Sequence, residues 1–111
     1  MAGLKNLPTD APRNLGALME RRTGQVLSMA LSDTEGLGMA LFSFPAGEMV
    51  SGEKYLGDTM YLVLRGDVRM RRKDAGDSLK EGDVLMVPSG VLHEIEALND
   101  CVLLHLTVSS S

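Results

Sequence analysis

The sequence predicts an all-β fold, a sandwich or a barrel, and three observations lead to this class. Short apolar runs are repeatedly interrupted by glycine and proline, of which the chain of 111 residues has 12 and 4. No segment keeps the three- and four-residue apolar spacing of a long helix. A hydrophobic content of 44% supports one core, as expected for a single domain of this length. Short strands separated by turns are therefore the expected elements.

The N-terminal part is predicted to be irregular and then briefly helical. Residues 1–13 contain two prolines and few apolar residues, and we interpret them as an arm that can cross onto a neighbouring subunit. The single domain then spans residues 14–111. Asn14 is a candidate N-cap for a short helix that ends at Gly24. Its apolar side is formed by residues spaced three and four apart, with one arginine: Leu15, Leu18, Met19 and Arg22.

Strands and turns alternate after this helix. We expect a strand over residues 25–32, a turn over 33–36 and a second strand over 37–44, which the Pro45 to Gly47 segment terminates. Residues 67–79 are predicted to form a hairpin with its turn at 74–77. The hairpin carries a run of basic residues: Arg69, Arg71, Arg72 and Lys73. We interpret this run as a solvated edge. Anion docking is the alternative role, which nothing else in the sequence supports.

The strand over residues 60–64 is apolar on both faces. If Thr59 and Tyr61 face a pocket, then Met60 and Leu62 face outward. A strand that is buried on both faces needs a second cover. In a small barrel without outer helices a partner subunit provides that cover, so we predict a homodimer.

The segment from Gly82 to Ala97 organises the rest of the chain. A tight turn at Gly82 precedes the apolar run 84–87, and a break at residues 88–90 separates it from a strand that starts at His93. Strand side chains alternate between faces, so His93, Ile95 and Ala97 point one way and the two intervening glutamates point to water. His93 is therefore expected to point inward at the mouth of a strand.

The spacing of Gly82, Pro88, Gly90 and His93 resembles the second motif of the cupin superfamily. The last motif position departs from the pattern, because Ala97 stands where the family has asparagine. Four residues agree at four fixed offsets, which makes the match specific.

Residues 47–66 resemble the first cupin motif in their two glycines, Gly47 and Gly66. Glu53 stands at the first histidine position, Tyr55 at the second, and Thr59 at the position of the glutamate. The two motifs with the hairpin between them span about half of the chain. In length the chain is similar to the small one-domain cupins of bacteria, the cupin-2 conserved-barrel group.

The resemblance implies a double-stranded β-helix, which is a jelly-roll barrel of two antiparallel sheets with a pocket inside. It also implies that Glu53, Tyr55, Thr59 and His93 occupy the place where metal-bearing cupins hold a divalent ion. Glu53 and His93 are good ligands, whereas a tyrosine with an ordinary pKa of about 10 is a poor one. Two good ligands are too few for tight binding. We therefore expect no certain cofactor and at most a weakly held divalent metal ion at Glu53 and His93.

The expected pocket gathers residues from both motifs and from the last strand: Glu53, Tyr55, Thr59, Tyr61, His93 and His105. His105 lies in the apolar segment 101–108, on its more mixed face, which suits a pocket wall. It could serve as a pocket donor or a third ligand. The alternative is a histidine that is satisfied within the core.

Composition limits the partners and the compartment. A net charge of −4 argues against nucleic acid and against an anionic membrane surface. The single cysteine, Cys101, lies in an apolar strand, and a buried thiol fits the reducing cytoplasm. No apolar run has the length of a membrane span, and the N-terminus has no secretory apolar region.

Two classes of function fit these observations. The first is a small-molecule-binding domain without a tightly bound catalytic metal, acting as a sensor, storage or accessory protein. The second is a small enzyme. It would be either a metal-dependent dioxygenase or isomerase with altered ligands, or a metal-free isomerase or lyase. In the metal-free enzyme His93 would be the general base and Tyr55 or Tyr61 the acid.

Overall fold

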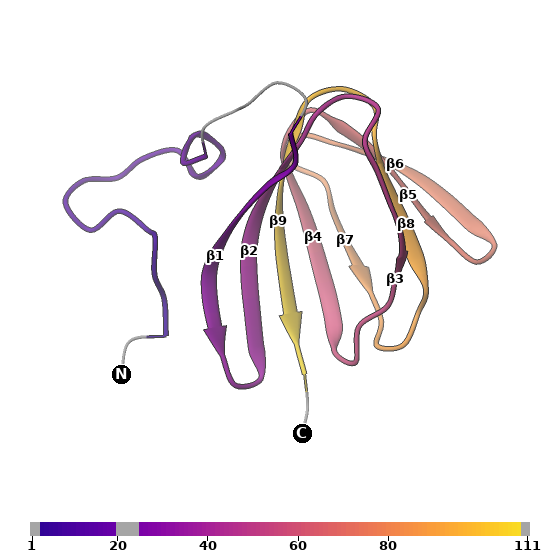
Figure 1. Ribbon diagram of the computed structural model, residues 1–111, viewed down its shortest axis with the longest axis horizontal. Coiled ribbons are helices and arrows are strands. Elements are labelled where there is room, and N and C mark those ends of the chain that lie inside the picture. The colour runs from indigo at the N-terminus through magenta and orange to yellow at the C-terminus, as the bar shows by residue number, and fades with distance from the viewer. Residues whose placement is uncertain (1–2, 20–24, 110–111) are drawn as a thin grey trace.

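The computed structural model describes residues 3–19 and 25–109 and consists of two antiparallel sheets that face each other as a jelly roll (Figure 1). Sheet A has the order β1 (Leu27–Thr34), β2 (Leu37–Phe44), β9 (Cys101–Val108), β4 (Asp58–Arg65) and β7 (Val84–Val87). Sheet B has the order β3 (Met49–Glu53), β8 (His93–Ala97), β5 (Asp67–Arg72) and β6 (Ala75–Lys80). The predicted all-β class and the jelly-roll architecture are confirmed.

The core lies between the two sheets. On sheet A it is formed by inward residues of the central strands, such as Tyr61, Val63 and Leu103. On sheet B the alternate residues Met70 and Ile95 meet them. All five are at most 4% exposed. Burying a side chain of this size stabilises the fold by about 1.5–3 kcal/mol, so the two-residue period of these strands determines which face closes the barrel.

Gly66 makes the crossing from sheet A to sheet B possible. It lies between β4 and β5 with a φ of 80°, and a Cβ at this position would lie 2.4 Å from the Asp100 carbonyl oxygen. Any other residue would therefore clash and would also be strained. This accounts for the last glycine of the first motif in terms of backbone geometry.

The predicted N-terminal helix is wrong. The structure has only a 3-10 turn at Leu15–Ala17, and the Asn14 side chain makes no capping hydrogen bond. Forming a single helical turn fixes the backbone angles of several residues and gains few hydrogen bonds. The length of such a turn therefore depends on its tertiary contacts. One such contact is with β4, because the Cβ that Gly16 lacks would lie 3.3 Å from the Cβ of Leu64. The rest of the predicted helix, including its stop at Gly24, lies outside the described residues. Within the described ranges no helix is long and apolar enough to cross a membrane.

Two strand boundaries also differ from expectation. The first strand starts at Leu27 and continues to Thr34, so its turn has only Glu35 and Gly36. The β5–β6 turn lies at Lys73 and Asp74 rather than at residues 74–77. The reason is that the ladder continues to the pair Arg72 and Ala75, which places Lys73 in the turn with a φ of 24°.

The outer face of sheet A is apolar across its width, as the sequence predicted for the 60–64 strand. Toward β1 this face is covered, since Leu41 is 0% exposed, whereas toward β7 Val84 is 58% and Met86 is 54% exposed. The face carries two rows of cross-strand partners, Met29, Leu41, Leu104, Leu62 and Val84 in one and Met39, Leu106, Met60 and Met86 in the other.

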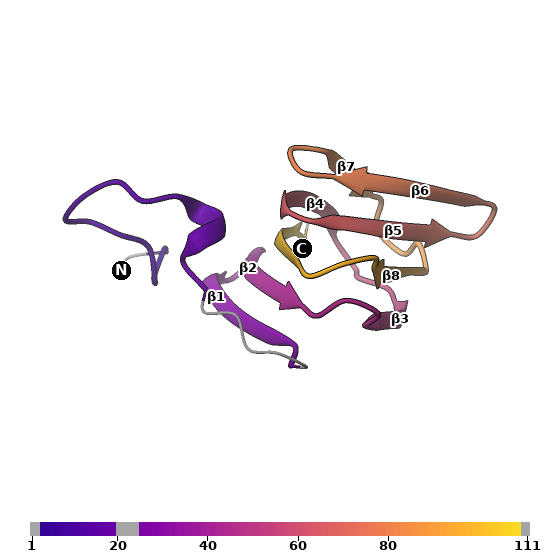
Figure 2. The same ribbon diagram turned by 90° about the horizontal axis from the view of Figure 1, so that it is seen from above.

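The N-terminal arm lies beside β1, on the side away from sheet B (Figure 2). The Lys5 backbone N–H donates to the Leu31 carbonyl at 2.8 Å, and the Asn6 side chain donates to the Ala30 carbonyl at 2.7 Å. Lys5 also pairs with Asp33 at 3.1 Å. These contacts hold the arm on its own chain. Its crossing onto a neighbouring subunit and the division of the chain at residue 13 stay predictions.

We predict that the open half of the outer face of sheet A, over β4 and β7, is the contact surface of a homodimer. Light scattering at micromolar concentration should give twice the chain mass of 11.9 kDa. Met86→Glu should shift the mass toward the monomer, because it places a charge in an apolar contact. Leu98→Glu is the matched control, since Leu98 is exposed but follows β8. A monomeric wild-type chain would contradict the prediction.

Candidate functional site

A cavity of about 240 Å³ lies inside the barrel. Four of its lining residues carry polar groups: Glu53, Tyr55, Tyr61 and His105. The others are apolar: Val26, Phe42, Phe44, Val50, Ile95 and Leu103. An apolar space with a few convergent polar groups is the usual form of a small-molecule site. This cavity is therefore the candidate functional site.

Glu53 and His93 are brought together by the β3–β8 ladder. The two residues are direct cross-strand partners, although the register shifts between Val50 and Glu53. Direct partners have side chains on the same face of a sheet, with Cβ atoms about 5 Å apart. His93 is 3% exposed and therefore points into the barrel, as the sequence predicted.

A hydrogen bond between Tyr61 and His93 joins the two sheets. The Tyr61 hydroxyl lies 2.7 Å from Nε2 of His93, and Nδ1 of His93 lies 3.0 Å from the Val91 carbonyl oxygen. A carbonyl oxygen only accepts, so Nδ1 carries the hydrogen and donates it to Val91. In the neutral imidazole Nε2 then accepts from the Tyr61 hydroxyl. This arrangement fixes both the ring orientation and the tautomer of His93.

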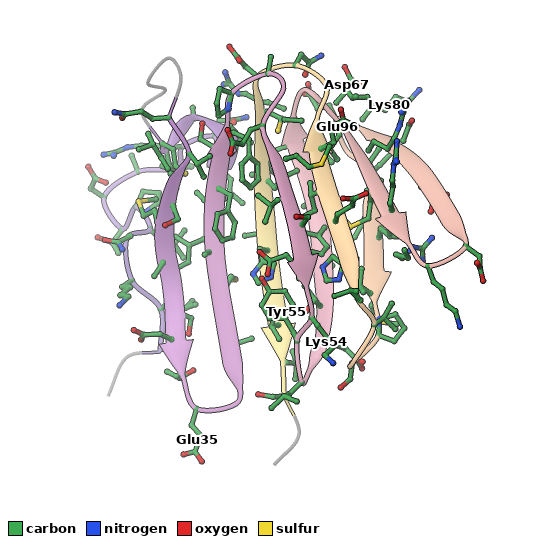
Figure 3. All side chains as sticks on the ribbon, turned by 45° about the vertical axis from the view of Figure 1, so that its right-hand side comes forward. Glu35, Lys54, Tyr55, Asp67, Lys80 and Glu96 are labelled. Atoms are coloured by element: carbon green, nitrogen blue, oxygen red, sulfur yellow. The ribbon has the colours of Figure 1, made fainter. Side chains whose placement is uncertain are left out.

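Tyr55 lies on the loop between β3 and β4, at the lower end of the barrel in Figure 3. The loop is attached to the second motif, because the Gly90 N–H donates to the Tyr55 carbonyl at 2.8 Å. The Tyr55 ring is 5.1 Å from the His105 ring and 6.0 Å from the His93 ring, centroid to centroid. The backbone of the second motif thus positions Tyr55, which stands at the second histidine position of the first motif.

His105 faces the cavity from β9, opposite Tyr61 in the β4–β9 ladder. Its ring centroid is 5.1 Å from that of Tyr61, and the edge-to-face contact with Phe42 has a centroid distance of 5.5 Å. Nε2 of His105 is 3.5 Å from the Thr107 hydroxyl, at the limit of a hydrogen bond. The ring of His105 is therefore part of the cavity wall, and its Nε2 makes only a weak hydrogen bond.

Thr59 is buried but does not line the cavity. Its hydroxyl is 3.0 Å from that of Thr107, its cross-strand partner. His93 is likewise absent from the cavity wall, and its hydrogen bond joins it to Tyr61, which lines the cavity. Of the six expected pocket residues, four line the cavity directly.

Burial favours the uncharged forms of three side chains that line the cavity, His105, Tyr61 and Tyr55. It lowers the pKa of His105 to about 4, with a smaller contribution from the charge of nearby His93. Burial also raises the pKa of Tyr61 far above its ordinary value, with further contributions from Tyr55 and Glu53. The pKa of Tyr55 is raised by burial first and by Glu53 second. At neutral pH the site therefore combines protonated tyrosine hydroxyls with the neutral imidazole of His105.

The side chains do not fit a tightly bound metal ion. Nε2 of His93 is engaged with Tyr61, and the Thr59 hydroxyl is engaged with Thr107. The described part of the chain contains no group of three or more His, Cys, Asp or Glu side chains that could hold an ion. Catalytic transition metals usually have three such ligands. The donor set therefore departs from the metal site of the family that the motifs resemble.

The sequence reasoning missed the apolar wall and one basic residue. Phe42 and Phe44 stack with a centroid distance of 5.8 Å, and both line the cavity. Their signal was their period-two spacing in a predicted strand. Arg72 was assigned to a solvated edge, but it is the cross-strand partner of His93 and shares its face. The parity of Val68 and Met70, which point inward, would have placed Arg72 on that face as well.

No protein-family model and no curated protein matches the chain. Among solved structures it is similar to a cupin superfamily protein from Desulfitobacterium hafniense, with 43% identity, a TM-score of 0.95 and coverage of 98% of this chain and 100% of that chain. A conserved protein of unknown function from Streptococcus pyogenes has 22% identity, a TM-score of 0.94 and coverage of 100% and 97%. A cupin 2 conserved barrel domain protein from Leptotrichia buccalis has 22% identity, a TM-score of 0.87 and coverage of 97% and 51%. The last two likenesses show the fold alone.

We expect a chelator to leave the melting temperature nearly unchanged. A native-state metal at 100 times its Kd would add about 2.7 kcal/mol, or on the order of 10 °C for a chain of this size. Calorimetry with and without chelator measures this difference. A large drop that one divalent ion reverses, and that is absent in His93→Ala, would contradict the expectation.

The pH dependence of stability should reveal the buried, neutral His105. The unfolded chain binds a proton near pH 6.5, whereas the folded chain binds it only near pH 4. The unfolded state thus holds more protons between these values, and the free energy of unfolding falls as pH falls through this window, by on the order of 3 kcal/mol. Chemical denaturation should show a shallower decline for His105→Gln. Identical slopes for the two proteins would refute this assignment.

Proposed function

The chain belongs to the cupin superfamily, and on that premise we propose that it binds a small organic molecule without a tightly bound catalytic metal. The observation that carries the proposal is the cavity between the sheets, whose apolar wall ends in a cluster of polar groups. Such a wall stabilises an apolar ligand by removing its surface from water, and the polar groups orient it.

The polar end of the cavity indicates what the ligand carries. Tyr55 stays protonated, because its pKa is raised, and so offers a hydroxyl donor, whereas the Tyr61 hydroxyl already donates its hydrogen to His93 and can only accept from a ligand. Glu53 offers a carboxylate that accepts hydrogen bonds and disfavours an anion. We infer a ligand with a hydroxyl or amine group at one end of an apolar body.

The size of the cavity limits the ligand further. At about 240 Å³ it lies below the range of roughly 300–1,000 Å³ that is typical of drug-sized ligands. The wall is aromatic on one side, where Phe42 and Phe44 stack. A molecule with a single ring or a short branched chain fits both the volume and this wall.

A metal-free enzyme is the second candidate, and the Tyr61–His93 hydrogen bond of 2.7 Å is the observation that favours it. A hydroxyl bonded to a fixed imidazole is a route for moving a proton to or from a ligand in the cavity. Binding is preferred, because the Nε2 lone pair of His93 is already occupied by Tyr61. Conversion of a bound ligand that is lost in His93→Gln, while binding persists, would identify the enzyme.

We also propose a reducing compartment, the cytoplasm, for this protein. Its single cysteine, Cys101, is 2% exposed, and burial raises the pKa of the thiol to about 11. A buried, protonated thiol is inert and serves as a core residue. The proposal thus requires neither a disulfide nor a reactive thiol.

Calorimetric titration with benzyl alcohol, benzylamine and benzoate tests the binding proposal. The three probes share one ring and differ in the charge of a single group. We expect the alcohol and the amine to bind in the cavity, and benzoate to bind there at least about tenfold more weakly, because like charges near Glu53 oppose it. Binding in the cavity is the part that Val50→Phe removes. Glu53→Gln should reduce this difference.

Val50→Phe is the variant that blocks the cavity, since Val50 lines it and is only partly buried. It should weaken all probes that bind the wild type by about tenfold or more, because the added ring volume occupies their space. Val84→Phe is the matched control on the outer face, where the residue is 58% exposed. Equal affinities in both variants would place binding elsewhere and overturn the proposal.

A further inference from the structure

A second hollow lies on the other side of His93 from the cavity. It has a volume of about 380 Å³ and is formed where the end of β5 meets β8. We name it the basic groove, after the charged residues that line it beside His93: Arg71, Arg72, Lys73 and Glu94. Three of these are basic and one is acidic, in a chain whose overall net charge is −4. The local charge is thus opposite in sign to that of the whole protein.

Arg72 is the inward-facing member of this group. It continues the inward parity of Met70 and is the direct cross-strand partner of His93. The ladder thereby produces a row of three side chains on one face of sheet B, in the order Glu53, His93 and Arg72. The Arg72 side chain is 25% exposed, so its charge lies partly out of solvent.

The guanidinium of Arg72 is only partly satisfied. Its Nη2 donates to a carboxylate oxygen of Asp77, which holds the side chain in place. Its Nε is buried and has no hydrogen-bond partner among residues 3–19 and 25–109. A buried donor without a partner costs free energy, and the cost is larger for a charged group. An acceptor beside Nε would recover that cost.

The other basic residues are free to approach such an acceptor. Arg71 faces Glu94, but its Nε is 4.0 Å from Oε1 of Glu94, and the Arg71 side chain is 56% exposed. Exposed pairs at this distance contribute little, so Arg71 can turn to another partner. Lys73 is exposed in the adjoining turn. The groove therefore offers one cation anchored by Asp77 and two exposed ones.

We propose that the basic groove binds the oxyanion, carboxylate or phosphate, of a small molecule, with Arg72 as the anchoring residue. An oxyanion accepts from the guanidinium of Arg72, which lines the groove, in a charge-assisted hydrogen bond, which is stronger than a neutral one. Arg71 and Lys73 add attraction from the rim. The site is separate from the cavity and does not depend on the function proposed for it, because the two spaces share no lining residue.

Calorimetric titration with inorganic phosphate and with succinate, at constant ionic strength set by chloride, tests this site. We expect saturable binding of at least one probe, and the tighter of the two identifies the oxyanion that the groove prefers. Arg72→Gln should weaken binding by about tenfold or more, because it removes a charge-assisted hydrogen bond. Val50→Phe should leave it unchanged, which separates this site from the cavity.

Arg69→Gln is the matched control. Arg69 lies on the same strand and carries the same charge, but it is exposed on the outer face and does not line the groove. If Arg69→Gln and Arg72→Gln weaken binding equally, the loss reflects the net charge of the protein and not this site, and the proposal is overturned. The absence of saturable binding to the wild type would overturn it as well. If Arg72→Gln does not fold, the double variant Arg72→Gln with Asp77→Asn takes its place in the comparison. The double variant removes both partners of the ion pair.

Discussion

The hydrogen bond between the Tyr61 hydroxyl and the His93 imidazole joins the two sheets inside the barrel, and the layout of both hollows depends on it. Its two residues come from β4 and β8, which belong to different sheets. The second imidazole nitrogen is held by the Val91 carbonyl, so the ring cannot turn without breaking a buried bond. Loss of either partner would leave a buried polar group unpaired, at a cost of about 1–3 kcal/mol. The contact is therefore structural as well as chemical, and it keeps the cavity and the basic groove apart.

The row formed by Glu53, His93 and Arg72 across sheet B gives the interior two ends of opposite charge. The carboxylate lines the apolar cavity and the guanidinium lines the basic groove. Glu53 and Tyr55 stand at positions where metal-bearing cupins have histidines, so the fold keeps the glycines of the motif while the donor chemistry changes. A jelly roll tolerates this because its strands are positioned by ladder pairing and core packing rather than by an ion.

The fold class and most strands could be predicted from the sequence, because alternation and glycine turns are local signals. The inward direction of His93 followed from the two glutamates that alternate with Ile95 and Ala97, and the outward direction of Met60 and Leu62 followed in the same way. The helix after Asn14 could not be predicted correctly, since its length depends on contact with β4. The exclusion of Thr59 from the cavity depends on Thr107, 48 residues away, and no local pattern contains that pairing. The position of Arg72 was available from strand parity, but the four basic residues were interpreted together as one solvated edge, so the parity was not applied to Arg72.

The strand order of sheet A has a consequence for how the chain is made. β9 is the final strand of the barrel, yet it lies in the centre of its sheet, between β2 and β4. Sheet B is complete once residue 97 has been synthesised, whereas the larger sheet stays divided until β9 leaves the ribosome. Until then β2 and β4 each expose an unpaired edge, which is a template for association with other chains. The barrel can therefore close only once β9 has emerged, and insertion of this one strand between the edges of β2 and β4 adds His105 and Leu103 to the cavity wall.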